Sequence, residues 1–319
     1  VVRRLRTDCH GFNNDGIDIE MTRNVLVEDC DICAGDDGIV LKAGRNRDAW
    51  RVGRPTENVT VRNCTFENNA GYSIEVALQH SDATTAPCDI VVENCRFHEC
   101  SVGNEGAPIT IDNLDGSLTV SRCSFVQNSG NAFASAIYVK GWTSGFVNVL
   151  RSTFSGNNST VDGGAPVIDT HAPTLVANCT FVDNPSPASI WSTLVLGEDS
   201  AVASTVFSGN KAGANDVYCS GPLRMAYVYA RGWQSLSGEV SETNCVRGVD
   251  SLPCVAPLDS RTVEGVSQVR FAAGEDLVGG NSVVECDAAE RAFFRVHGGL
   301  PQLVGVHLAK TLEPGNIHL

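Results

Sequence analysis

Apolar positions recur along this chain in a unit that is repeated seven times. In each unit a valine stands three residues before a small or cysteine side chain, and an isoleucine or phenylalanine follows two residues later. The valines are Val27, Val61, Val92, Val120, Val149, Val176 and Val202, and the small residues are Cys30, Cys64, Cys95, Cys123, Ser152, Cys179 and Thr205. Successive units are 34, 31, 28, 29, 27 and 26 residues apart. Repeats of about 20–50 residues are typical of solenoids, in which each unit packs on its neighbours.

Each unit contains short stretches with the alternation of a β-strand. In the third unit Ile90 and Val92 share one face, and Cys95 and Phe97 alternate with the parity shifted by one. This shift predicts a corner between two strands. A third strand is predicted from the following apolar pairs: Ile39/Leu41, Ile74/Val76, Ile109/Ile111, Ile137/Val139 and Leu194/Leu196.

An asparagine follows the aromatic position by three residues in five of the units. These residues are Asn69, Asn128, Asn157, Asn184 and Asn210. Asparagine tolerates the left-handed backbone conformation of a tight turn, and stacked asparagines can hydrogen-bond along a solenoid axis. No window has a long amphipathic helical period. Three short strands per coil predict an all-β fold, the right-handed parallel β-helix.

The regularity of the pattern divides the chain into three parts. Residues 1–213 are predicted to form regular coils, and residues 214–258, with three cysteines and weaker periodicity, an irregular insertion. Apolar pairs separated by glycines predict further coils, truncated at the end, in residues 259–319. Solenoids are normally closed by terminal caps, and none is evident here, so we expect a fragment of a longer protein.

Composition narrows the partners. The 319 residues are only 19% charged and carry a net charge of −14, which disfavours nucleic acid as a ligand. No run of about 18 apolar residues is present that could span a membrane. We expect a monomer.

The cysteines have two interpretations. Cysteine-rich chains often hold metals or disulfides, but here most cysteines occur once per coil and alternate with serine or threonine, which favours small buried packing residues. Four cysteines, Cys219, Cys245, Cys254 and Cys286, lie outside the column and are candidates for a disulfide. The total of 13 is odd, so at least one is unpaired within the chain.

Two acidic motifs are offset by 22 residues, the length of one coil. They are Asn14-Asp15-Gly16-Ile17-Asp18-Ile19 and Asp36-Asp37-Gly38-Ile39-Val40-Leu41. If the coils are in register, Asp15 and Asp37 lie about 4.8 Å apart. Repulsion among the carboxylates should raise at least one pKa, as acid–base cleavage of a glycosidic bond requires. Asp-Gly is also turn chemistry, which is the structural alternative.

A basic run follows the second motif. Its members are Lys42, Arg45, Arg47, Arg51 and Arg54. Such a concentration beside carboxylates in an acidic chain indicates an anionic ligand such as a uronate polymer. The alternative is a solvated loop whose arginines pair with Asp36, Asp37 and Glu57.

Residues 13–66 resemble the polygalacturonases, family 28 of the glycoside hydrolases. Asn13-Asn14-Asp15-Gly16 is similar to the family motif Asn-Thr-Asp-Gly, and Gly35-Asp36-Asp37 to its Gly-Asp-Asp motif. The segment from Lys42 to Cys64 also looks like bacterial members. The resemblance implies an inverting hydrolase in which Asp37 is the general acid and Asp15 and Asp36 activate water. Asn13, the basic run and Tyr72 would bind an acidic polysaccharide.

Two later family features are missing. Where the family has Gly-His-Gly, the matching stretch is Asn69-Ala70-Gly71-Tyr72, which puts Ala70 at the histidine position. Where the family has an Arg-x-Lys pair that grips the substrate carboxylate, the strand Ala107–Ile111 has no basic residue. His80 and Lys140 are candidate substitutes. Beyond about residue 100 the chain resembles generic β-helix repeat proteins of surfaces and adhesins.

Three functions follow from these observations. The first is hydrolysis of a pectin-type polysaccharide, with no cofactor and no metal; the second is a non-catalytic surface, adhesin or glycan-binding module. The third is a calcium-dependent lyase or epimerase, for which Lys42 is the candidate base. The resemblance implies a secreted or cell-surface protein.

Overall fold

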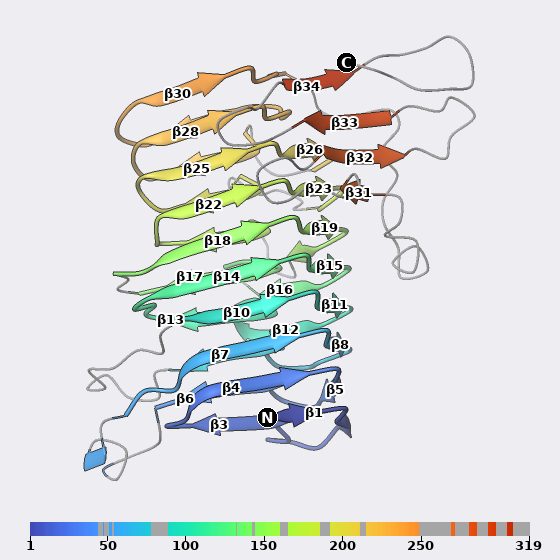
Figure 1. Ribbon diagram of the computed structural model, residues 1–319, viewed down its shortest axis with the longest axis vertical. Coiled ribbons are helices and arrows are strands. Elements are labelled where there is room, and N and C mark those ends of the chain that lie inside the picture. Colours follow the sequence, from blue (N-terminus) through green and yellow to red (C-terminus); the bar gives the residue numbers. More distant parts are fainter. Residues whose placement is uncertain are drawn as a thin grey trace.

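The computed structural model describes residues 1–43, 47, 51–52, 54–77, 89–131, 133–141, 144–159, 165–185, 192–210 and 215–248, together with four later strands. The described chain is a right-handed parallel β-helix, as predicted (Figure 1). Three long parallel sheets run along the molecule, and each coil contributes one strand to each sheet.

The first sheet contains the strands that begin each repeat. Its members, in order, are β1 (Val2–Arg3), β4 (Arg23–Glu28), β7 (Glu57–Arg62), β10 (Ile90–Glu93), β14 (Ser117–Ser121), β18 (Phe146–Leu150), β22 (Thr174–Ala177), β25 (Ser200–Ala203), β28 (Leu223–Ala226) and β30 (Val240–Thr243). The repeated valines lie opposite one another in this sheet: Val61 pairs with Val92, and Val92 with Val120.

The second sheet contains the small and aromatic positions. Its members are β2 (Arg6–Cys9), β5 (Asp31–Ala34), β8 (Thr65–Glu67), β11 (Arg96–His98), β15 (Ser124–Val126), β19 (Thr153–Ser155), β23 (Thr180–Val182) and β26 (Val206–Ser208). The corner before it is the predicted one: Asn63 and Asn94 there have φ of 54° and 51°, the left-handed conformation that asparagine tolerates.

The third sheet positions the candidate site. Its members are β3 (Ile17–Glu20), β6 (Ile39–Lys42), β9 (Ile74–Ala77), β13 (Ile109–Asp112), β17 (Ile137–Lys140), β21 (Ile168–Thr170), β24 (Leu194–Leu196), β27 (Val217–Cys219) and β29 (Trp233–Ser235). All five predicted apolar pairs are found here. A short sheet lies in the turn between the second and third sheets, formed by β12 (Ser101–Glu105), β16 (Ser129–Asn131) and β20 (Asn158–Ser159).

The core is built from columns of like side chains. Phe66, Phe97, Phe125, Phe154, Phe181 and Phe207 are all fully buried. Their neighbouring rings stack with centroids 4.5–4.9 Å apart and planes within 8° of parallel. The column of small residues is also buried, and its cysteines are free. These cysteines therefore act as packing residues, and burial raises the pKa of the Cys179 thiol to about 12.

The asparagines form a hydrogen-bonded ladder rather than the turns themselves. The side-chain amide of Asn128 donates to Asn157 at 2.9 Å, and Asn157 donates to Asn184 at 2.9 Å. The left-handed conformation belongs instead to the preceding residue, for example Gln127 with φ of 55° and Asp183 with φ of 45°. The predicted stacking is confirmed, and the predicted position of the tight backbone bend is corrected by one residue.

The regular coils continue beyond residue 213. Strands β27 to β30 pair in parallel with their neighbours; Val217 lies opposite Leu194, and Leu223 opposite Ser200. The expected irregular insertion at 214–258 is therefore corrected for the residues described up to 248. Cys219 and Cys245 are free, whereas Cys254 and Cys286 lie outside the described residues.

The last described strands have another arrangement. They are β31 (Val269–Phe271), β32 (Asn281–Glu285), β33 (Phe293–His297) and β34 (Gly305–Leu308). All three of their pairings are antiparallel, so these strands do not repeat the parallel coil expected for residues 259–319.

Candidate active site

Strands β3 and β6 bring the two acidic motifs onto adjacent rungs. Ile17 pairs with Ile39, and the backbone N–H of Gly16 donates to the carbonyl of Asp37 at 2.8 Å. The offset of 22 residues predicted from the sequence is thus the observed register. The acidic residues that precede the two strands consequently lie side by side.

Asp15, Asp36 and Asp37 form what we call the carboxylate patch. One oxygen from each side chain lies within 4.8 Å of the others, and all three are half-buried. Lys42 contacts the patch: its Nζ lies 3.5 Å from Asp15 Oδ2 and 2.6 Å from Asp18 Oδ1. Negative charge is therefore concentrated in a small volume, and a neighbouring cation compensates part of it.

The following coil holds Asp37 in place. The backbone N–H of Tyr72 donates to Asp37 Oδ1 at 2.8 Å. The residue before it must be a glycine, because a Cβ at Gly71 would lie 2.6 Å from both the Asp36 carbonyl carbon and Asp37 Oδ1. The close approach of two rungs therefore fixes the orientation of the Asp37 carboxylate.

A fourth carboxyl group, Glu75, is hydrogen-bonded to Asp37. Glu75 lies in β9, opposite Val40 in β6. Sequence reasoning missed it because the two strands are 35 residues apart, whereas the acidic motifs are 22 apart. The signal was present: aligning Ile74/Val76 on Ile39/Leu41 places Glu75 on the outward face beside the patch.

The pKa values of this group are raised. Burial, and then the charges of Asp36 and Asp15, raise the pKa of Asp37 to about 6 despite the Tyr72 N–H. Burial and the Asp37 charge raise the pKa of Glu75 to about 8. Burial also raises the pKa of Asp36, with Asp15 adding to it and Lys42 opposing. Because the Tyr72 N–H favours the Asp37 anion, the proton shared by the Asp37–Glu75 pair rests mainly on Glu75.

The predicted substrate-binding residues are only partly brought together. Lys42 and Tyr72 contact the patch as described, and Asn13 is exposed on the turn before Asp15, with φ of 54°. Arg47, Arg51 and Arg54 are exposed, and Arg45 and the candidate His80 lie outside the described residues. Glu57, an expected partner of these arginines, forms an ion pair with Arg23 instead.

The register changes which residue occupies the position expected for a histidine. Since Ile39 pairs with Ile74, the neighbour of Asp37 on the next coil is Tyr72. Ala70 lies further back, with its N–H on the carbonyl of Ala34. The structure therefore corrects the sequence match: a tyrosine, not an alanine, stands beside the candidate acid.

Further polar groups continue along the outward face of the third sheet. Lys140 Nζ lies 3.0 Å from Asp112 Oδ1, two rungs beyond Lys42 and its neighbours. One rung further, burial raises the pKa of Asp169 to about 7, and its Oδ1 is buried without a hydrogen-bond partner. Tyr138, between them, stacks on Phe133 with ring centroids 5.1 Å apart. The face thus combines charged groups with aromatic surface.

The fold defines a class of protein, the pectin-lyase-like right-handed β-helices. A family model described as "Right handed beta helix region" matches residues 6–86 and 52–147. A probable polygalacturonase from Arabidopsis thaliana is 30% identical over 86 residues, which is 27% of this chain and 16% of that protein. The chain therefore corresponds to a small part of that curated relative.

Two solved structures have similar overall shapes at low identity. The surface adhesin PfbA of Streptococcus pneumoniae aligns over 93% of this chain and 67% of its own, with 10% identity and a TM-score of 0.42. The catalytic domain of Agl-KA aligns over 72% of this chain and 41% of its own, with 12% identity and a TM-score of 0.37. Among the described residues, no helix is long and apolar enough to cross a membrane.

Proposed function

We propose that this protein hydrolyses glycosidic bonds in an acidic polysaccharide of the polygalacturonate type. The observation that carries the proposal is a carboxyl group with a pKa of about 6, Asp37, placed within reach of two further carboxylates. Hydrolysis of this bond needs a protonated carboxyl on the leaving oxygen and an ionised one beside water.

Each residue of the patch has a role in this proposal. Asp37 transfers a proton to the glycosidic oxygen as the bond from that oxygen to the anomeric carbon breaks. Asp15 and Asp36 accept a proton from the attacking water, whose oxygen forms the new bond. Glu75 is a positioning residue: its carboxyl proton is hydrogen-bonded to Asp37 and replaces the proton that Asp37 gives away.

Substrate charge is compensated by the exposed arginines and by Lys140. Arg47, Arg51 and Arg54 follow directly on the strand that carries Lys42, so they are tethered close to the patch. Ala107, one rung beyond Tyr72, offers no basic group. We therefore propose that the uronate carboxylates are held mainly by this arginine segment, which favours binding of a polymer over a single sugar.

The stereochemical outcome is a separate proposal. Inverting enzymes usually separate their two carboxyls by about 6.5–9.5 Å and retaining enzymes by about 5–5.5 Å. The nearest oxygens of the patch are closer than either. We propose inversion, because Asp15 and Asp36 can hold one water between them while Asp37 protonates the leaving group. Nuclear magnetic resonance of the first-formed anomer measures this directly, and a retained configuration would assign a nucleophile to the patch.

The proposed activity is tested with polygalacturonate and measurement of reducing ends. Asp37→Asn keeps the size of the side chain and the Tyr72 hydrogen bond but removes the proton donor. We expect it to lower kcat by about 100- to 10,000-fold, the usual contribution of a general acid. Glu93→Gln, which removes a carboxyl from the first sheet, is the matched control and should leave the rate unchanged. Full activity in Asp37→Asn would refute the assignment.

The pH profile tests the role of Glu75. The rate should fall at low pH as Asp36 and Asp15 are protonated, and at high pH as the Asp37–Glu75 pair, with pKa values of about 6 and about 8, loses its proton. In Glu75→Gln the alkaline limb should move to lower pH, because the negative neighbour that raises the Asp37 pKa is gone. An unchanged profile would show that Glu75 has no part in the reaction.

A non-catalytic glycan-binding role is the alternative, favoured by the missing basic residue at Ala107. It predicts that the wild type binds oligogalacturonates and releases no reducing ends. A calcium-dependent lyase would instead form an unsaturated product that absorbs in the ultraviolet, and a chelator would abolish it.

A further inference from the structure

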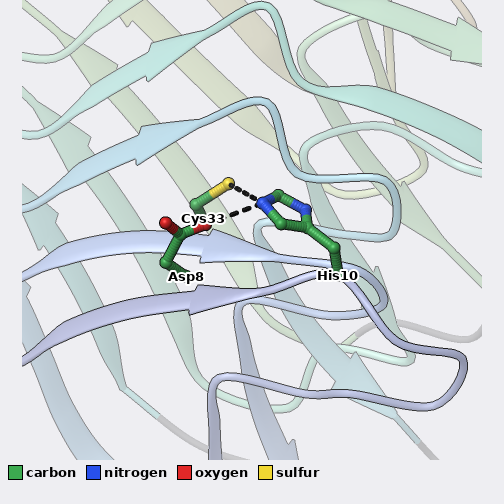
Figure 2. A group of neighbouring side chains, drawn as sticks. All are labelled: Asp8, His10 and Cys33. Atoms are coloured by element: carbon green, nitrogen blue, oxygen red, sulfur yellow. Dashed lines mark hydrogen bonds and ion pairs between the residues drawn. The ribbon is translucent and has the colours of Figure 1, made fainter.

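Asp8, His10 and Cys33 converge on one point of the surface, on the second sheet and apart from the carboxylate patch. His10 Nε2 lies 2.7 Å from Asp8 Oδ1 and 3.8 Å from Cys33 Sγ. Figure 2 shows the imidazole ring turned so that this nitrogen meets both other side chains. All three groups are ordinary ligands of transition metals.

The coil register explains how the three residues meet. Asp8 in β2 lies directly opposite Cys33 in β5, 25 residues later. Strand alternation buries Ile32 and turns Cys33 outward, so the thiol leaves the column of packing cysteines. His10 follows β2 immediately, and its ring lies over the pair.

The geometry differs from that of a catalytic Cys–His–Asp relay. In a relay the carboxylate holds one imidazole nitrogen, while the opposite nitrogen accepts the proton of the nucleophile. Here the carboxylate and the thiol both approach Nε2, the same nitrogen. Convergence of three donor atoms on a single point is the requirement for a shared cation.

The surroundings suit a small cation. The three residues line a pocket of about 430 Å³, which Asp31 and Glu67 also line. Glu67 is on the rung after Cys33, and its Oε1 lies 3.3 Å from His98 Nδ1. The pocket is open to solvent, since the side chains of Asp8 and His10 are 69% and 64% exposed. A metal there could complete its coordination with water.

We propose that Asp8, His10 and Cys33 bind a zinc ion. Zinc takes sulfur at about 2.3 Å and nitrogen or oxygen at about 2.0–2.2 Å, so tetrahedral ligands lie roughly 3.3–3.7 Å apart. The observed 3.8 Å between Sγ and Nε2 fits, and the 2.7 Å between Nε2 and Asp8 Oδ1 requires only a small opening. A thiolate and an imidazole select zinc over calcium or magnesium, which prefer oxygen ligands.

Bound zinc would join two coils through side chains. Asp8 and His10 belong to the first coil and Cys33 to the next, so the ion would add a cross-link to the hydrogen bonds between β2 and β5. It would also fix the turn that leads from His10 to Asn13 and the carboxylate patch.

The experiment uses the whole chain, purified with a reducing agent and freed of metal. We expect stoichiometric zinc binding by calorimetry, and with cobalt a thiolate-to-metal charge-transfer band together with the visible bands of a tetrahedral site. Zinc should raise the Tm, because a ligand that binds only the folded state stabilises it. Cys33→Ser should abolish the charge-transfer band, and Cys33→Ser and His10→Gln should each weaken zinc binding more than tenfold.

Matched controls are Cys245→Ser, a half-buried free cysteine, and His171→Gln, both away from the pocket. They should bind zinc as the wild type does, and circular dichroism should show every variant folded. Unchanged affinity in Cys33→Ser, or cobalt spectra without a thiolate band, would overturn the proposal. So would binding that survives Cys33→Ser and is lost in Asp36→Asn, since the ion would then belong to the carboxylate patch.

Discussion

Side chains of one type are stacked at the same spacing inside the β-helix and on its surface, with opposite consequences. Inside, Phe97 and Phe125 stack at 4.5 Å and are fully buried. Outside, Asp15 and Asp37 occupy equivalent positions on adjacent rungs, and their charges repel. Register alone is therefore neither stabilising nor destabilising; the side chain that it repeats decides the sign.

The difference indicates where selection for stability ends. Rings and amides gain from stacking, because each contacts its neighbours above and below. Ionised carboxylates lose from it, and the loss is observed as the raised pKa values of Asp37 and Glu75. A column of repelling groups that persists in a fold this regular is expected at a functional site.

The largest effect should come from breaking an inward column. Phe125→Ala removes a buried ring from the middle of the stack and should lower the free energy of unfolding by about 3–5 kcal/mol. Urea denaturation checks this. Phe146→Ala is the control, because Phe146 is 50% exposed in β18 and should change stability by under about 1 kcal/mol. Equal losses in both variants would contradict the role of the stack.

Relieving the outward column should have the opposite sign. Carboxyls whose pKa is raised on folding bind protons more tightly in the folded state, so their repulsion is absent at low pH. Stability is lost as pH rises from the ordinary values near 4 through about 6 for Asp37 and about 8 for Glu75. Glu75→Gln should therefore be more stable than the wild type above pH 8, by on the order of 3 kcal/mol.

This gain should vanish below about pH 4, where both carboxyls of the wild type are protonated in either state. Thermal unfolding of the two proteins across this range measures it, with Glu93→Gln as the control for a surface carboxyl. A difference that does not depend on pH would show that Glu75 acts through packing rather than charge.

The smallest of the three effects concerns the asparagine ladder. Asn157→Ala removes a buried amide that bonds Asn184 and the carbonyl of Phe125, and should cost about 1–3 kcal/mol. Asn148→Ala, which loses one 3.4 Å bond to Thr119 on the surface, is the control and should cost much less. Similar losses in the two would remove the distinction between the ladder and an ordinary surface amide.

Much of the fold could be predicted because the repeat is local. The valine, cysteine and phenylalanine positions recur at short fixed separations within each coil, so strand, corner and column follow from alternation. The continuation through β27 to β30 was missed, because there Cys219 and Trp233 occupy positions that earlier coils give to isoleucine and leucine. The pairing is retained although the residue pattern is not.

The candidate site was predictable only where the loops between strands are short. Asp15 and Asp37 are one short coil apart, so their contact could be inferred from the motif offset. Glu75 is separated from Asp37 by the long segment that contains the arginines, and the length of that segment conceals the register. His10 was missed for another reason: Cys33 was grouped with the packing cysteines, although its parity with Asp8 places it on the surface.

The constancy of the cross-section has a consequence for how such a chain can change. The coil from Cys123 to Arg151 meets its two neighbours with the same contacts that those neighbours would make with each other. Removing it as one block would shorten the molecule by about 4.8 Å and leave the carboxylate patch intact. Growth and loss by whole coils therefore offer this architecture a means to alter its reach without redesigning its chemistry.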